Sequence, residues 1–141
     1  MDRNGSAVWT GSIREGKGEV STESGALKSV PYSFTSRFEQ GAGTNPEELL
    51  GAAHAACFSM AFSGQLTGEK LTAERISTTA TVTIEKVDGG FGITHVHLAM
   101  EAKIPGADKA TFDRLAGAAK AGCPVSKLFN TKITLDAKLV G

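Results

Sequence analysis

The sequence predicts an α+β fold with antiparallel sheet. Two observations carry this prediction: the predicted strands come in groups joined by short turns, and the predicted helices do not alternate strictly with strands. The chain has 141 residues. This length fits one compact domain and leaves too little chain for two independent cores, so we expect a single domain over residues 1–141.

The N-terminal part of the chain is predicted to form short strands. Residues 6–13 and 19–22 are strand candidates separated by turn residues at 15–18. Residues 32–39 alternate, with Tyr32, Phe34 and Phe38 on one face. This period of two predicts a further strand and places Arg37 on its more polar side.

A long helix is expected next. Thr44 is the predicted N-cap, Pro46 lies in the first turn, and Glu47 closes a capping box. The helix should run to about residue 66, because glycines at 64 and 68 bracket its end. Alanines at 52, 53, 55, 56 and 61 give it a nearly flat surface, which lets another backbone come close.

The C-terminal half is predicted as a hairpin, two helices and a last strand. Residues 76–84 and 96–104 form the hairpin around a turn at 87–90, with His95 and His97 opposite the apolar face. A helix over 108–121 ends at Gly122, and Cys123-Pro124 begins a short helix over 125–129. Residues 132–140 alternate as a strand.

Charge and hydropathy exclude several classes of partner. Lys plus Arg number 15 and Asp plus Glu number 15, without a block of either sign, so we expect no nucleic acid and no anionic membrane surface as a partner. The weakly polar stretch 49–62 is shorter than the roughly 20 residues of a bilayer span. Residues 1–6 lack the apolar core of an export signal, and a soluble cytoplasmic protein is expected.

The chain has two cysteines, Cys57 and Cys123. They are too few for a disulfide scaffold and too far apart in sequence for paired zinc ligands. Each thiol is either an inert core residue or a redox group, and for Cys57 the first reading is favoured by pattern alone. Cys123 lies at a predicted helix N-terminus, which lowers the pKa of a thiol, so Cys123 should be the more acidic of the two.

Two segments resemble the OsmC and organic hydroperoxide resistance family. They are GTNPEELLGAAHAACFSM at residues 43–60 and AGCPVS at residues 121–126, and His54 with Cys-Pro-Val-Ser indicates the OsmC branch. The resemblance implies sheets packed around a central Ala-rich helix in an intertwined homodimer. It also implies a peroxidase of the oxidative or osmotic stress response, without metal, haem or flavin, that reduces organic hydroperoxides and, more weakly, hydrogen peroxide.

The resemblance also assigns roles to residues. Cys57 matches the nucleophile and Cys123 the resolving thiol that forms a disulfide with it. Glu47 matches the supporting carboxylate and Arg37 the guanidinium, with Arg14 as the alternative arginine. The expected reductant is a lipoyl dithiol carried on another protein.

Helix geometry adds a constraint on this site. On one unbroken helix, Glu47 and Cys57 are separated by about 15 Å along the axis and lie on different faces. We therefore expect helices of two subunits to cross, so that Glu47 of one chain serves Cys57 of the other. An apolar wall near the site would favour alkyl or aryl hydroperoxides; the candidates are Phe38, Phe58, Met60, Phe62, Leu128 and Phe129.

Three further readings remain open at this point. His95 and His97 could share a metal, but the sequence supplies no pattern for the missing ligands and a zinc site is not expected. His54 could act as a base or fill a gap in helix packing, and packing is favoured. Rival functions are a glutaredoxin-like thiol-transfer protein that uses Cys123 and a non-catalytic stress-induced binding protein with inert thiols.

Overall fold

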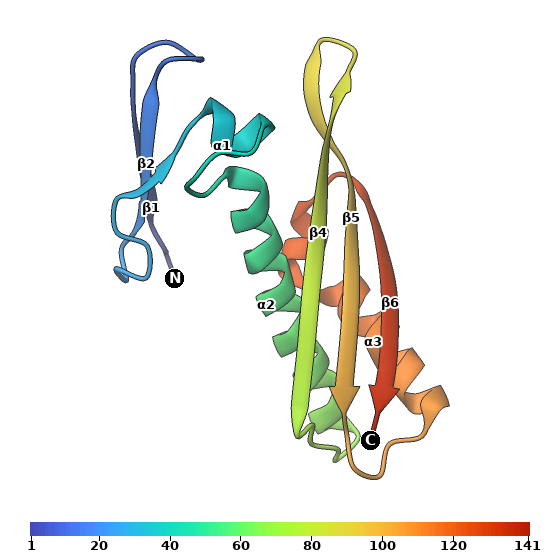
Figure 1. Cartoon of the computed structure of the whole chain (residues 1–141). Helices are drawn as coiled ribbons and strands as arrows, with labels where there is room; N and C mark the ends of the chain where they lie inside the picture. Colours follow the sequence, from blue (N-terminus) through green and yellow to red (C-terminus); the bar gives the residue numbers. More distant parts are fainter. The chain divides into compact units, whose positions relative to one another are not determined.

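A computed structural model describes residues 1–141 as two compact units, Met1–Leu49 and Leu50–Gly141 (Figure 1). Each unit contains a sheet of three strands, and helices complete the chain. The α+β class is therefore confirmed. None of the helices has the length and apolar content needed to cross a bilayer.

The first unit contains an antiparallel sheet in the order β1-β2-β3. Its strands are β1 (Gly5–Thr10), β2 (Lys17–Thr22) and β3 (Val30–Tyr32). Gly18 on β2 lies against the rings of Trp9 and Tyr32, whose centroids are 5.4 Å apart. A Cβ atom at Gly18 would lie 2.3 Å from the Tyr32 ring, so this aromatic pair requires glycine beneath it.

The segment after β3 corrects one prediction, because residues 34–38 form a helix and not a strand. In α1 (Phe34–Phe38), Ser33 is the N-cap and forms a capping box with Ser36. Phe34 and Phe38 are four residues apart, and their ring centroids are 5.0 Å apart. The spacing of these rings fits one helical turn as well as a strand, and the serine cap decides for the helix.

Helix α2 (Pro46–Gly68) begins one residue later than its predicted cap implies. The side-chain Oδ1 of Asn45 accepts a hydrogen bond from the Glu48 backbone N–H at 2.8 Å, so Asn45 is the N-cap. Thr44 instead donates from Oγ1 to the Glu48 carboxylate at 2.6 Å. Pro46 at the first helical position explains the difference, because it fixes the cap at the residue before it.

The second unit contains a mixed sheet in the order β4-β5-β6. Strands β4 (Arg75–Val87) and β5 (Gly90–Lys103) form the predicted antiparallel hairpin. Strand β6 (Lys132–Val140) pairs with β5 in parallel, where antiparallel pairing was expected. The helices α3 (Lys109–Gly122) and α4 (Pro124–Leu128) lie between the two strands in sequence and carry the chain back along the sheet.

Helices α2 and α3 cover one face of this sheet and enclose the core (Figure 1). Phe62 of α2 lies at the centre, stacked with Phe58 and edge-on to Phe112 of α3. Alternate residues of β5 complete the core, while His95 and His97 lie on the opposite face, as predicted. The buried apolar residues of β5 and of the segment just after it are Val96, Leu98, Met100, Ala102 and Ile104.

Candidate functional site

The two cysteines lie together in the second unit. Cys57 is on α2, Cys123 is at the junction of α3 and α4, and their sulfur atoms are 2.7 Å apart. Both cysteines are free thiols. A disulfide has an S–S distance of about 2.05 Å, so only a small movement is needed to form one.

The backbone fixes Cys123 on both sides. Its N–H donates to the Ala119 carbonyl oxygen at 2.9 Å, and its own carbonyl oxygen accepts from the Lys127 N–H at 3.1 Å. Pro124 starts α4 directly after it. Cys123 is 0% exposed, whereas Cys57 is half-buried at the edge of the core. Cys57 is therefore partly open to solvent, whereas Cys123 is enclosed.

The two thiols differ in acidity. Burial raises the pKa of Cys57, and its hydrogen bond with Cys123 raises it further, against a weaker opposite effect of the Val125 N–H. Burial also raises the pKa of Cys123, but hydrogen bonds from Cys57, Ser126 and Val125 outweigh it and leave this pKa below its ordinary value. Cys123 is thus the more acidic thiol, in agreement with its position at the start of a helix.

His54 and Ser126 form a second pair beside the sulfurs. His54 is 0% exposed, and its Nε2 lies 2.7 Å from the Ser126 hydroxyl oxygen. The ring packs edge-on against Phe129, and Nδ1 has no hydrogen-bond partner. Burial lowers the pKa of His54, so the ring is neutral at pH 7. The sequence indicated the packing of His54 but missed Ser126, whose only signal is its place three residues after Cys123.

Arg37 and Glu47 form an ion pair in the first unit. The guanidinium Nη2 is 2.8 Å from Glu47 Oε1, and Nε lies 3.1 Å and 3.3 Å from the two carboxylate oxygens. The Glu47 side chain is 8% exposed and that of Arg37 is 37% exposed. Arg14 instead lies over the Phe34 ring, 4.8 Å from its centroid. Two guanidinium nitrogens of Arg37 thus bind the Glu47 carboxylate as a fork, and of the two candidate arginines Arg37 is the one that pairs with Glu47.

An aromatic pocket of about 250 Å³ lies beside Arg37. Its walls come from the sheet of the first unit and from α1, and they combine apolar rings with one guanidinium. Phe38 was predicted from the sequence as part of an apolar wall. Trp9 of β1 and Ile13 in the turn after β1 were not. The lining residues are Trp9, Ile13, Tyr32, Ser33, Phe34, Arg37 and Phe38.

Comparison with known proteins identifies the family. Residues 39–138 match the family described as OsmC-like protein. The chain is 55% identical to Peroxiredoxin OsmC from Escherichia coli (strain K12). The alignment covers 99% of this chain and 97% of that protein. The chain belongs to the OsmC family. It is accordingly a peroxidase of a peroxide-detoxifying, stress-related family.

More distant members agree with this assignment. An organic hydroperoxide resistance protein of Xanthomonas axonopodis pv. citri (strain 306) is 38% identical over 70% of this chain and 67% of its own length. The structure of an OsmC-like protein from Vibrio cholerae superimposes with a TM-score of 0.77 over 97% of this chain and 99% of that one, at 16% identity. The second match shows that the OsmC fold is shared.

The apolar wall expected in this OsmC-family chain is corrected in part. Phe58 and Phe62 are 0% exposed and belong to the core, so they line no surface. Leu128 and Phe129 do line a hollow of about 180 Å³ on the second unit. Its other lining residues are Leu50, Val82, Ile93, Asn130 and Thr131.

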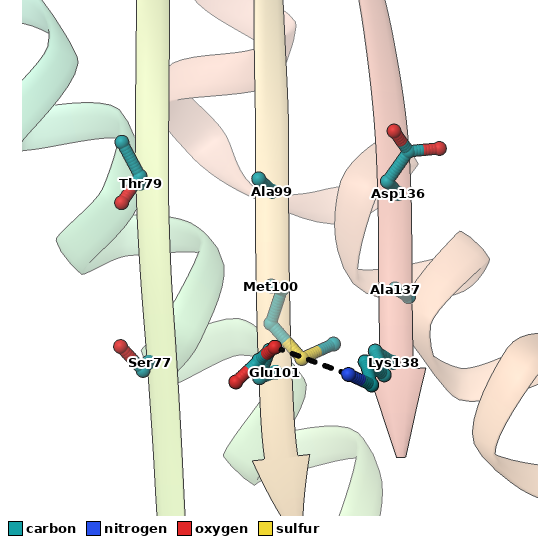
Figure 2. Close-up of a pocket in the computed structure, with 8 residues that line it drawn as sticks. All are labelled: Ser77, Thr79, Ala99, Met100, Glu101, Asp136, Ala137 and Lys138. Carbon is teal, nitrogen blue, oxygen red and sulfur yellow. Dashed lines mark ion pairs between the residues drawn. The ribbon is translucent and has the colours of Figure 1, made fainter. Parts of the chain in front are cut away.

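The outer face of the second sheet is polar. A hollow of about 390 Å³ on it contains the ion pair of Glu101 and Lys138 at 3.6 Å and no cysteine (Figure 2). Further along the same strands, His95 and His97 share the Thr134 hydroxyl at 2.8 Å and 2.6 Å. No group of three or more His, Cys, Asp or Glu side chains in the chain could hold a metal ion.

Proposed function

We propose that this chain reduces organic hydroperoxides to alcohols through Cys57 and Cys123. The observation that carries the proposal is the pair of free sulfurs 2.7 Å apart, of which one belongs to the half-buried Cys57 and the other to the fully buried Cys123. Accessibility assigns the first step to Cys57, because the attacking thiolate must reach the peroxide. The buried thiol then fits the resolving role, which requires only contact with Cys57.

The reaction has two steps. The Cys57 thiolate attacks the terminal peroxide oxygen, the S–O bond forms, the O–O bond breaks, and the leaving alkoxide takes up a proton to become the alcohol. Cys57 is then a sulfenic acid. The Cys123 thiolate attacks this sulfur, the S–S bond forms, and the S–O bond breaks to release hydroxide, which is protonated to water.

The first step requires a positive charge near Cys57. Burial raises the pKa of Cys57, and within the second unit the lower pKa belongs to Cys123. A guanidinium beside Cys57 would reverse this order by favouring its thiolate, and would also hydrogen-bond the peroxide oxygens. We assign this role to Arg37, held in orientation by the fork with Glu47.

Arg37 and Glu47 of one chain would serve Cys57 of a second chain in a homodimer. Helix α2 is continuous from Pro46 to Gly68. Ten residues of helix place Glu47 and Cys57 about 15 Å apart along its axis, on different faces. Exposed apolar side chains in both units supply surface for such a dimer; the most exposed after Met1 are Met60, Leu128, Ile13, Val8 and Phe91.

The pockets support a preference for organic hydroperoxides over hydrogen peroxide. The pocket beside Arg37 is lined by aromatic rings, and the hollow at Leu128 and Phe129 is also apolar. Either surface would bury an alkyl or aryl group, which hydrogen peroxide lacks. We further propose that a lipoyl dithiol of another protein reduces the disulfide, and that the reaction takes place in the cytoplasm without nucleic acid or membrane partners.

Thiol titration tests the reaction. One equivalent of cumene hydroperoxide should remove both free thiols per chain in the wild type. Cys57→Ser should consume no peroxide, and Cys123→Ser should stop at a sulfenic acid that a dimedone probe captures. If the wild type loses no free thiol, the non-catalytic alternative is supported. If Cys123→Ser fails in the first turnover, Cys123 is the nucleophile and Cys57 the resolving thiol.

Complementation tests whether Arg37 acts across the dimer. Arg37→Met and Cys57→Ser would be mixed, unfolded together and refolded. If Arg37 acts in trans, one of the two sites in each mixed dimer regains both groups, because Cys57 of the Arg37→Met subunit meets Arg37 of the Cys57→Ser subunit, whereas the other site lacks both. If it acts in cis, every site lacks one group and the mixture stays inactive. Each parent refolded alone is the matched control.

A rate comparison tests the substrate class and reductant. With dihydrolipoamide as reductant, the kcat/KM for cumene hydroperoxide should exceed that for hydrogen peroxide. Trp9→Ala and Phe129→Ala would show which apolar surface holds the organic group, since only the surface used should lower this ratio. Equal rates for the two peroxides would remove the proposed preference.

A further inference from the structure

Two residue pairs run in parallel between α2 and α4. Cys57 meets Cys123, and His54 meets Ser126 at 2.7 Å. His54 precedes Cys57 by three residues on α2, so the two side chains share a face of that helix. Ser126 is the third residue of α4, and a side chain at this position reaches back toward the N-cap, here Cys123. The histidine–serine pair is therefore one helical turn from the sulfurs.

The unpartnered Nδ1 determines the direction of the hydrogen bond. His54 is buried and neutral, so only one ring nitrogen carries a proton. A proton on Nδ1 would leave a buried N–H without an acceptor, whereas a proton on Nε2 is satisfied by the Ser126 oxygen. His54 is then the donor, and the Ser126 hydroxyl proton is free to point at another acceptor.

The acceptor available to Ser126 is the sulfur of Cys123. Ser126 is the third residue of α4 and Cys123 is its N-cap, which places the hydroxyl near this sulfur, and the proximity of Ser126 lowers the pKa of Cys123. A rotation of the Ser126 hydroxyl toward this sulfur would complete a donor chain from His54 Nε2–H through Ser126 Oγ–H to Cys123. In this arrangement the His54 Nε2 proton and the Ser126 hydroxyl proton each have one acceptor, and only the lone pair of His54 Nδ1 has no partner.

We propose that His54 and Ser126 are positioning residues that hold the Cys123 sulfur as a thiolate for its attack on the Cys57 sulfenic acid. This inference deepens the proposed function and rests on it for the attack step, but not for the state of Cys123. In that step the Cys123 lone pair forms the S–S bond and hydroxide leaves Cys57. Cys123 is oxidised, the Cys57 sulfenic sulfur is reduced, and the hydroxide becomes water by taking a proton from solvent.

The neutral ring gives His54 the role of a fixed donor and not of a general base. A base would need to take the proton of Cys123 through Ser126 and become a buried imidazolium. Burial opposes that charge, and no carboxylate accompanies Nδ1 to stabilise it. A side-chain amide can also donate one hydrogen bond at this place, so His54→Gln should retain the function that His54→Leu removes.

The test separates the two chemical steps. Stopped-flow measurements would follow sulfenic acid formation and then disulfide formation with cumene hydroperoxide. Ser126→Ala and His54→Leu should slow disulfide formation at least about tenfold, the effect of losing one hydrogen bond to a charged group. His54→Gln should restore most of the rate. His95→Leu removes another histidine–hydroxyl pair, on the opposite face of the sheet, and should change neither step.

A second measurement is independent of peroxidase activity. In a Cys57→Ala background, the ultraviolet absorbance of the Cys123 thiolate would be titrated with and without the Ser126 and His54 changes. The inference predicts a lower thiolate fraction at neutral pH for Ser126→Ala and His54→Leu, and an unchanged fraction for His54→Gln. An unchanged fraction in Ser126→Ala, or a Gln variant as impaired as Leu, would overturn it. If no variant reacts with peroxide, the proposed function fails while this titration still decides the role of the pair.

Discussion

The two compact units differ in where their apolar side chains lie. Every buried apolar residue belongs to Leu50–Gly141, whereas the buried positions of Met1–Leu49 are two glycines and Ser36, Thr44 and Glu47. Val8 and Ile13 of the first unit are 65% and 68% exposed. Since burial of apolar surface is the main force in folding, the first unit lacks an apolar core of its own, and its exposed apolar side chains are consistent with the proposed dimer.

This difference separates the groups of the proposed reaction. The sulfurs are held by a packed core, which fixes their distance without help from charge. The guanidinium is held by an ion pair at a partly exposed surface, in the unit without an apolar core. Both sulfurs therefore belong to the unit with a packed core, whereas the Arg37–Glu47 pair belongs to the unit without one.

The largest effect that would sharpen this contrast is in the core. Phe62→Ala should lower the free energy of unfolding by about 3–5 kcal/mol, because it removes a fully buried ring that contacts Phe58 and Phe112. Urea denaturation measures it. Gln65→Ala, on the same helix at an exposed polar position, should change stability by less than about 0.5 kcal/mol. A small loss in Phe62→Ala would mean that the core does not hold the second unit.

The next effect concerns charge and should appear in rate. Arg37→Met should lower kcat/KM for cumene hydroperoxide by about 10²–10³, the usual effect of removing a group that stabilises developing negative charge. Arg37→Lys should recover part of the activity, since it keeps the charge but loses the fork with Glu47. Arg14→Met is the matched control and should retain activity. The reverse pattern would transfer the role to Arg14.

The third effect is a pH dependence of stability in the second unit. Burial lowers the pKa of His54 below that of the unfolded chain, about 6.5, so the unfolded state binds the additional proton. The free energy of unfolding is unaffected by His54 above about pH 6.5. Below that pH it decreases as the pH falls, by at most about 1.4 kcal/mol per pH unit. Urea midpoints between pH 7.5 and 5.5 measure it. His54→Gln should flatten this dependence, and an unchanged slope would exclude His54 as its source.

Long patterns made the second unit predictable from sequence. The alternation of β5 extends over many residues and leaves one register that buries Val96, Leu98 and Met100. The direction of β6 was not predictable, because an alternating strand looks the same in parallel and antiparallel pairs. Contacts such as His54 with Ser126 depend on how helices pack, and no local pattern encodes them.

Short patterns misled the prediction in the first unit. The alternation at residues 32–39 includes two rings at a spacing that also fits a helix, and the serine cap of α1 is a stronger local signal than the alternation. The assignment of Arg37 came from family resemblance and not from the predicted strand, so this error does not affect it, and it stays a prediction. Arg37 contacts its partner Glu47 from helix α1, where the prediction had placed a strand.

The smallest effect decides which residue caps α2. Asn45→Ala should lower the free energy of unfolding by about 1 kcal/mol or more, since it removes the cap to Glu48 and a hydrogen bond from Nδ2 to the Ser36 carbonyl. Thr44→Val removes only a hydroxyl bonded to the exposed Glu48 carboxylate, so it should cost less. Asn45→Asp keeps the cap and should lie between them. A larger loss in Thr44→Val would restore Thr44 as the cap, and urea denaturation of the three variants measures the order.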